Sequence, residues 1–160
     1  MNQQLRSFLW GSNASSLSFH IGSLLLRFFV GLAFCTVFEK FLPGPEGWGP
    51  ETWFIEDVRE MGFPFPVVFA WAAVLSEFFG GLLMMCGCLT RPAALLNAIV
   101  TFSATFLYHH GDIGGEGLLS FFFFIMCLVI VLFGAGKFSV DHWVWRRSNQ
   151  QATSGSSSQT

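Results

Sequence analysis

Long apolar stretches separated by short polar links dominate the hydrophobic pattern of this chain. A helix rises about 1.5 Å per residue, so a stretch of about 20 apolar residues crosses the roughly 30 Å hydrocarbon core of a bilayer. Four stretches have about this length, at residues 17–42, 66–89, 92–110 and 117–135. The pattern predicts an all-α fold, an integral membrane four-helix bundle.

The one sizeable link, residues 43–65, contains a shorter helical pattern of its own. Phe54, Val58 and Met61 recur at the i, i+4 and i+7 spacing of a helix face. Charged residues occupy the other side: Glu56, Asp57, Arg59 and Glu60. This spacing predicts a short amphipathic helix that lies on the membrane surface and caps the bundle. Its charged face is most simply a solvated face.

Composition supports the membrane class and excludes others. Hydrophobic residues make up 52% of the 160 residues and charged residues only 11%, against about 25% charged in soluble domains. A net charge of −2 gives no basis for a nucleic-acid partner. The four cysteines lie within or beside apolar segments, so no disulfide framework is expected. We divide the chain into an N-terminal segment (1–16), a membrane domain (17–144) and a disordered tail (145–160).

The distribution of basic residues predicts the orientation. Positive charges concentrate in cytoplasmic segments of membrane proteins. With the N-terminus inside, only Lys40 and Arg59 fall in outer loops. The basic residues at the inner ends are more numerous: Arg6, Arg91, Lys137, Arg146 and Arg147. Both termini are therefore expected in the cytoplasm.

Glu77 stands near the middle of the second apolar stretch, where a charge is costly unless it has a partner. Counting residues from the inner ends places Arg27 of the first stretch within roughly 5 Å of the same depth. The sequence thus predicts a buried Arg27–Glu77 ion pair. Such a pair either serves an activity or only fixes the register of the helices, and the sequence leaves both open.

Small and polar residues also recur along one side of each stretch, which marks the faces where membrane helices meet. They predict a polar seam inside the bundle, either as packing or as a ligand pocket. At the outer end the seam meets several titratable groups: Glu39, Lys40, His109, His110, Asp112 and Glu116. Their spacing matches no zinc or iron motif, so we expect no metal site and interpret them as groups that make ordinary interface hydrogen bonds, contact substrate or exchange protons.

Three segments together resemble a known family: LLRFFVGLAFCTVFEKFL, MGFPFPVVFAWAAVLSEFFGGLLMMCGCLTRPAAL and GGEGLLSFFFFIMCLVIVLFGAGKFSVD. Over residues 20–144 the chain is similar to the DoxX family of small four-span bacterial membrane proteins. The residues that carry the resemblance are Arg27, Lys40, Glu77, Gly87, Thr90, Arg91, Gly115, Glu116, Gly134, Gly136, Ser139 and Asp141. The chain differs from the commonest form in placing Glu39 before Lys40 and in its longer, Trp-rich first loop.

The resemblance implies a component of a quinone-linked oxidoreductase or redox-stress system in the bacterial inner membrane, with a quinone as the possible cofactor. Under it, His109, Glu116 and Lys40 are the candidate catalytic residues. The candidate quinone-binding residues are Glu39, Tyr108 and Arg91, and Asp141 belongs to the closing structural motif. The sequence contains no redox-centre motif, so electrons would come from a partner or from the substrate.

Two other functions fit the same residues. The chain could be a non-catalytic anchor or assembly factor whose acidic first loop docks another membrane or periplasmic subunit. It could also be a small solute or ion carrier, although it lacks the Gly/Pro-broken helices typical of carriers.

Overall fold

The computed structural model describes residues 16–36, 49–136 and 139–141, and these residues form only helices, turns and links. The helices are α2 (Ser16–Thr36), α3 (Thr52–Glu60), α4 (Pro66–Cys86), α5 (Thr90–Ser103) and α6 (Leu118–Phe133), and a π-helical turn, η2 (Ala104–Tyr108), directly continues α5. The predicted all-α class is confirmed, and α3 lies within the link where a short helix was expected. The proposed disordered tail lies outside the described residues.

Two of the described helices are long and apolar enough to cross a membrane, α2 over Ser18–Thr36 and α4 over its whole length. Helix α6 is apolar but shorter. The third predicted stretch is divided between α5 and η2. The membrane crossing of these last two stretches stays a prediction.

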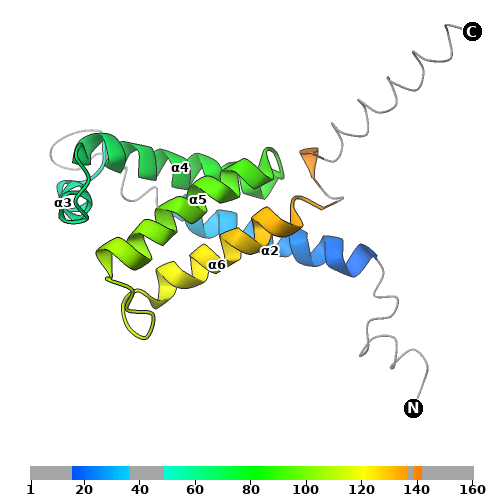
Figure 1. Cartoon of the computed structure of the whole chain (residues 1–160). Coiled ribbons are helices and arrows are strands. Elements are labelled where there is room, and N and C mark those ends of the chain that lie inside the picture. The colour runs from blue at the N-terminus through cyan, green and yellow to red at the C-terminus, as the bar shows by residue number, and fades with distance from the viewer. Residues whose placement is uncertain (1–15, 37–48, 137–138, 142–160) are drawn as a thin grey trace, which may run out of the picture.

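The helices pack as a bundle with two different ends (Figure 1). Helix α4 packs against both α2 and α5, and α5 packs against α6. The link between α4 and α5 forms one end, which we call the turn end. Helix α3 and the link between η2 and α6 lie at the opposite end, which we call the α3 end. The first turns of α2 extend past the turn end of α4 (Figure 1).

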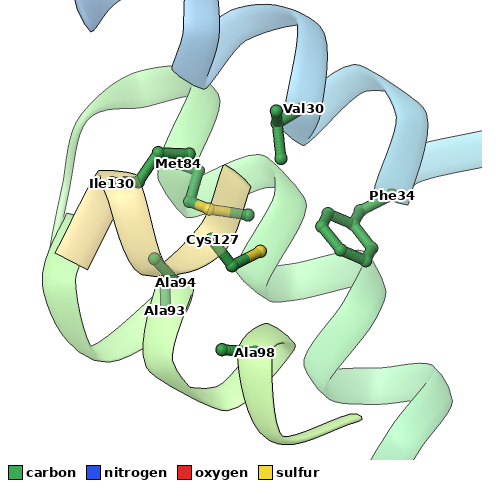
Figure 2. Packing of buried hydrophobic residues seen from close by; sticks show 8 residues of the cluster. All are labelled: Val30, Phe34, Met84, Ala93, Ala94, Ala98, Cys127 and Ile130. Atoms are coloured by element: carbon green, nitrogen blue, oxygen red, sulfur yellow. The ribbon is translucent and has the colours of Figure 1, made fainter. Parts of the chain in front are cut away.

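The buried core is small and made largely of short side chains (Figure 2). Its members are Val30, Phe34, Met84, Ala93, Ala94, Ala98, Cys127 and Ile130. Between α2 and α4 the backbones approach even more closely, because a Cβ on Gly31 would lie 2.5 Å from the Gly81 carbonyl oxygen. Small residues at helix interfaces are typical of membrane bundles, in which close packing replaces the hydrophobic effect.

Beside its apolar core, the bundle buries several polar side chains and exposes many large apolar ones. Arg27, Asn97 and Thr105 are fully buried, whereas Phe29 is 62% exposed and Leu132 is 74% exposed. Large apolar side chains cover the outward faces of α2, α4, α5 and α6. Exposed apolar surface on this scale marks contact with a partner or a membrane, and here it surrounds the bundle. The surface is therefore suited to lipid.

Candidate functional site

The turn end is built from backbone conformations that few residues adopt. Helix α4 ends at Gly87, whose left-handed φ of 69° reverses the chain, and the N–H of Cys88 donates to the Leu83 carbonyl at 2.9 Å. Leu89 is also left-handed, with φ of 48°. The first backbone N–H groups of α5 have no acceptor within their own helix and need one from outside it.

Asp141 supplies that acceptor from the far end of the chain. Its Oδ1 accepts from the Leu89 N–H at 2.8 Å and its Oδ2 accepts from the Thr90 N–H at 3.0 Å. Its own N–H donates to the Gly87 carbonyl at 3.0 Å. A carboxylate at a helix N-terminus satisfies free donors and interacts favourably with the helix dipole. Asp141 therefore caps α5 and ties the segment after α6 to the α4–α5 turn.

Arg27 belongs to the same cluster. Its guanidinium is fully buried, its Nη1 donates to the Met84 carbonyl at 3.5 Å, and it interacts electrostatically with Asp141. A side chain at Gly87 would collide with Nη1. Arg27, Gly87, Thr90 and Asp141, which all carry the family resemblance, thus meet at the turn end. Their contacts connect α2, the α4–α5 turn and the segment after α6.

The helix register places Arg27 and Glu77 at different depths. Arg27 lies beside Met84, whereas Cys35, further along α2, lies beside the residue that follows Glu77: its Sγ is 4.0 Å from the Phe78 carbonyl oxygen. Eight residues of α2 separate Arg27 from Cys35, which corresponds to about 12 Å along the helix. The expected equal depth is not found, because the first turns of α2 extend past the turn end of α4. The ion pair itself stays a prediction.

Arg91 lies at the turn end, at the start of α5. A Cβ on Gly134 would lie 3.1 Å from its Nε, and the Gly134 carbonyl accepts from the Ser23 hydroxyl at 3.2 Å. Seventeen residues of α5 and η2 separate Arg91 from Tyr108, or about 25 Å. The structure therefore does not bring Arg91 together with Tyr108 and its neighbour His109, the described candidates at the far end of this segment.

Tyr108, His109 and Glu116 do share the α3 end. The negative charges of Asp57 and Glu60 on α3, and of Glu116, act on the Tyr108 hydroxyl, with Asp57 the strongest of them. The rings of Tyr108 and His109 lie edge to face with centroids 4.9 Å apart. Lys40 and Glu39 lie outside the described residues. Within the described part of the chain, no three His, Cys, Asp or Glu side chains are placed to hold a metal ion.

A cavity of about 300 Å³ lies between α3, α4 and α5, and residue patterns alone did not reveal it. The apolar face of α3, made of Phe54, Val58 and Met61, forms one wall. The opposite walls come from α4 and the end of α5, including Ala73, Ser76, Glu77, Leu96, Ile99, Val100, Ser103 and Ala104. Glu77 is the charged residue in this lining. Two features of the sequence could have indicated this cavity. One is the carboxylate of Glu77 within an apolar stretch, and the other is the apolar face of the short amphipathic helix, which had no assigned packing partner.

Comparison with known proteins identifies the family of this chain. The model of the DoxX family matches residues 22–110, which is more than half of the chain. The chain belongs to the DoxX family. The resemblance seen in the residues is confirmed, and the matched region contains Arg27, Glu77 and the α4–α5 turn.

Two relatives extend the match beyond that region. An uncharacterized protein of Haemophilus influenzae is 32% identical over 130 residues, covering 76% of this chain and 82% of the relative. The Escherichia coli protein named "Inner membrane protein YqjF" is 30% identical over 131 residues, covering 76% of this chain and 90% of the relative. No solved structure matches the chain. This DoxX family membrane protein therefore has full-length relatives of similar size.

Proposed function

We propose that this DoxX family protein is an inner-membrane component of a quinone-linked redox system, and that it holds a lipid-soluble quinone in the cavity beneath α3. The name of the Escherichia coli relative, "Inner membrane protein YqjF", supports the inner membrane as the location of this protein. The apolar exterior of the bundle supports a position among lipids.

The observation that carries the proposal is a buried carboxylate in the wall of a largely apolar cavity. Glu77 is 7% exposed, and its cavity of about 300 Å³ falls at the lower end of the range for ligand pockets, about 300–1,000 Å³. Such pockets combine apolar walls with a few polar groups that orient the ligand. A quinone has the matching form, an apolar tail and a ring with two polar oxygens.

The position of the cavity also suits a ligand that arrives through the bilayer. Its lining residues Phe69, Leu96 and Ile99 are themselves exposed on the outside of the bundle. A ligand dissolved in lipid would therefore meet the cavity from the side, without crossing an aqueous phase.

The chain's own contribution would be to bind and orient the ring, because the sequence carries no redox-centre motif and electrons would come from a partner. Tyr108, His109 and Glu116 lie at the same end as the cavity, where they are candidates for exchanging protons with the aqueous side. Arg91 has no place in this proposal, because it lies at the turn end.

A substitution that fills the cavity tests the proposal. Ala73→Phe places a ring inside the cavity, whereas Val68→Phe adds the same ring to the exposed face of α4. Binding of a decyl-substituted benzoquinone to the purified protein should weaken at least about tenfold in the first variant, because the ring occupies ligand space, and stay unchanged in the second. Quenching of tryptophan fluorescence would report the binding.

Two results would contradict the proposal. One is native protein that binds no quinone in either redox state; the other is a bound quinone that Ala73→Phe does not displace. A native protein that binds no quinone but co-purifies with a stoichiometric partner would instead support the anchor or assembly function.

A further inference from the structure

We propose that the cavity beneath α3 selects ligands whose polar head donates hydrogen bonds, so that it binds the reduced hydroquinone in preference to the oxidised quinone. This inference rests on the proposed function for the identity of the ligand. The donor selectivity itself follows from the groups that line the cavity.

Both serine hydroxyls in the lining already use their hydrogen. Ser76 Oγ lies 2.9 Å from the Ala73 carbonyl oxygen, and Ser103 Oγ lies 3.0 Å from the Ile99 carbonyl oxygen. A carbonyl oxygen only accepts hydrogen bonds, so each hydroxyl must be the donor. Each serine therefore offers a ligand its lone pairs and no hydrogen.

Glu77 adds further acceptors at the same place. An ionised carboxylate carries no hydrogen and has about four lone-pair sites on its two oxygens, so it can accept from a ligand while it also accepts from another group. Glu77 follows Ser76 directly along α4, and both line the cavity. With Glu77 ionised, the described polar side chains on this wall offer a ligand only acceptors.

The rest of the described lining supplies no donor side chain. It consists of hydrocarbon side chains and the thioether of Met61, carried mostly by helices whose backbone N–H groups bond within the helix. A quinone oxygen is a carbonyl and only accepts, so it would find no donor side chain within the described lining to replace its hydrogen bonds to water. A hydroquinone hydroxyl donates a hydrogen bond, which the oxygens of Ser76, Ser103 or Glu77 can accept.

The expected preference is large, because sites that supply partners for a polar group reject analogues that leave those partners unused. One hydrogen bond to a charged group corresponds to about a tenfold to hundredfold difference in Kd. The dimethyl ether of the hydroquinone has the same ring and tail but no donor. It should bind as weakly as the quinone.

The experiment compares three probes on purified protein under anaerobic conditions: a decyl-substituted benzoquinone, its hydroquinone and the dimethyl ether of that hydroquinone. The readouts are Kd from tryptophan quenching and the shift in Tm. We expect the hydroquinone to bind at least about tenfold more tightly than the other two. Equal binding of the quinone and hydroquinone, or tighter binding of the ether, would overturn the inference.

Two variants locate the preference within the cavity. Glu77→Gln introduces an amide that donates as well as accepts, so it should improve quinone binding and narrow the ratio between the probes. If this variant does not fold, Ser76→Ala removes one acceptor and should weaken only the hydroquinone. A ratio that neither variant changes would overturn the assignment to this wall.

Two further probes separate failure of the inference from failure of the proposed function. Decylphenol has a donor head and an apolar tail but no quinone chemistry, and decyl methoxybenzene is its match without a donor. Donor-dependent binding of decylphenol, with no binding of the quinone or hydroquinone, would reject the quinone function and retain the selectivity. Binding of quinone and hydroquinone with equal affinity would reject the selectivity and retain the function.

Discussion

At the residue scale, Asp141 shows how one side chain can organise a helix that begins far from it in the sequence. It accepts two backbone hydrogen bonds at the start of α5 and interacts with the charge of Arg27. The family resemblance identified Asp141 as part of a closing motif, without indicating its partners. A carboxylate suits this position because each of its two oxygens accepts a hydrogen bond from one backbone N–H group.

Asp141→Ala should lower the free energy of unfolding by about 2 kcal/mol, because two helix-terminal N–H groups lose a charged acceptor. Chemical unfolding in detergent micelles would measure the change. The control is Glu51→Ala, an acidic residue at the N-terminus of α3 whose side chain makes no capping hydrogen bond. Equal losses in the two variants would show that the Asp141 contacts do not stabilise the turn end.

At the element scale, the packing of α2 on α4 depends on two glycines. A Cβ on Gly81 would lie 2.7 Å from the Gly31 carbonyl oxygen, and a Cβ on Gly31 would lie 2.5 Å from the Gly81 carbonyl oxygen. These are backbone atoms, so a larger residue would separate the helices. The separation would also disturb α4, which carries Glu77 and one wall of the cavity.

We therefore expect Gly31→Ala to lower the free energy of unfolding by about 1–3 kcal/mol through overpacking. Gly22→Ala is the matched control, because Gly22 lies on the same helix and has nothing within 4 Å of a hypothetical Cβ. It should leave stability unchanged or raise it by about 0.5–1 kcal/mol, since alanine favours the helix. Unfolding in micelles would report both; a stable Gly31→Ala would contradict the close approach.

The π-helical turn η2 is an element that the hydrophobic pattern did not predict. The hydroxyls of Thr101 and Thr105 each bond at 2.8 Å to the carbonyl four residues earlier, which loosens the helical ladder next to Ala104 in the cavity wall. Apolar periodicity did not distinguish the π-helical continuation from α5, because a five-residue element is too short to show a period of its own.

At the scale of the whole molecule, the apolar exterior and the distribution of charge together make a prediction about topology. Buried polar groups and exposed apolar faces suit a bundle surrounded by lipid, and basic residues favour the turn end as the cytoplasmic one.

A green fluorescent protein fused to the C-terminus should fluoresce, because the fusion partner folds in the cytoplasm, and alkaline phosphatase fused there should be inactive. A cysteine at Glu56 of α3, in a cysteine-free background, should react with a membrane-impermeant maleimide in intact spheroplasts. The opposite pattern of reporter activity and labelling would reverse the orientation, and with it the assignment of His109 and Glu116 to the outer side.

The sequence by itself determined the all-α class, the approximate extents of the helices and the amphipathic character of α3. It did so because each depends on residues that are neighbours along the chain, through the period of the helix and the length of each apolar run. The order and spacing of residues such as Arg27, Glu77, Gly87 and Arg91 were sufficient to indicate the family. They were not sufficient to show which of them lie together.

Only the tertiary structure decided those groupings. In the structure, Arg27 and Glu77 lie at different depths, and Arg91 lies about 25 Å from Tyr108. Glu77 lines a cavity of which α3 forms one wall. The physical reason is that each grouping joins residues from different helices, whose relative register depends on where two glycine backbones meet and where a capping carboxylate attaches. Such long-range contacts leave no periodic pattern in the sequence.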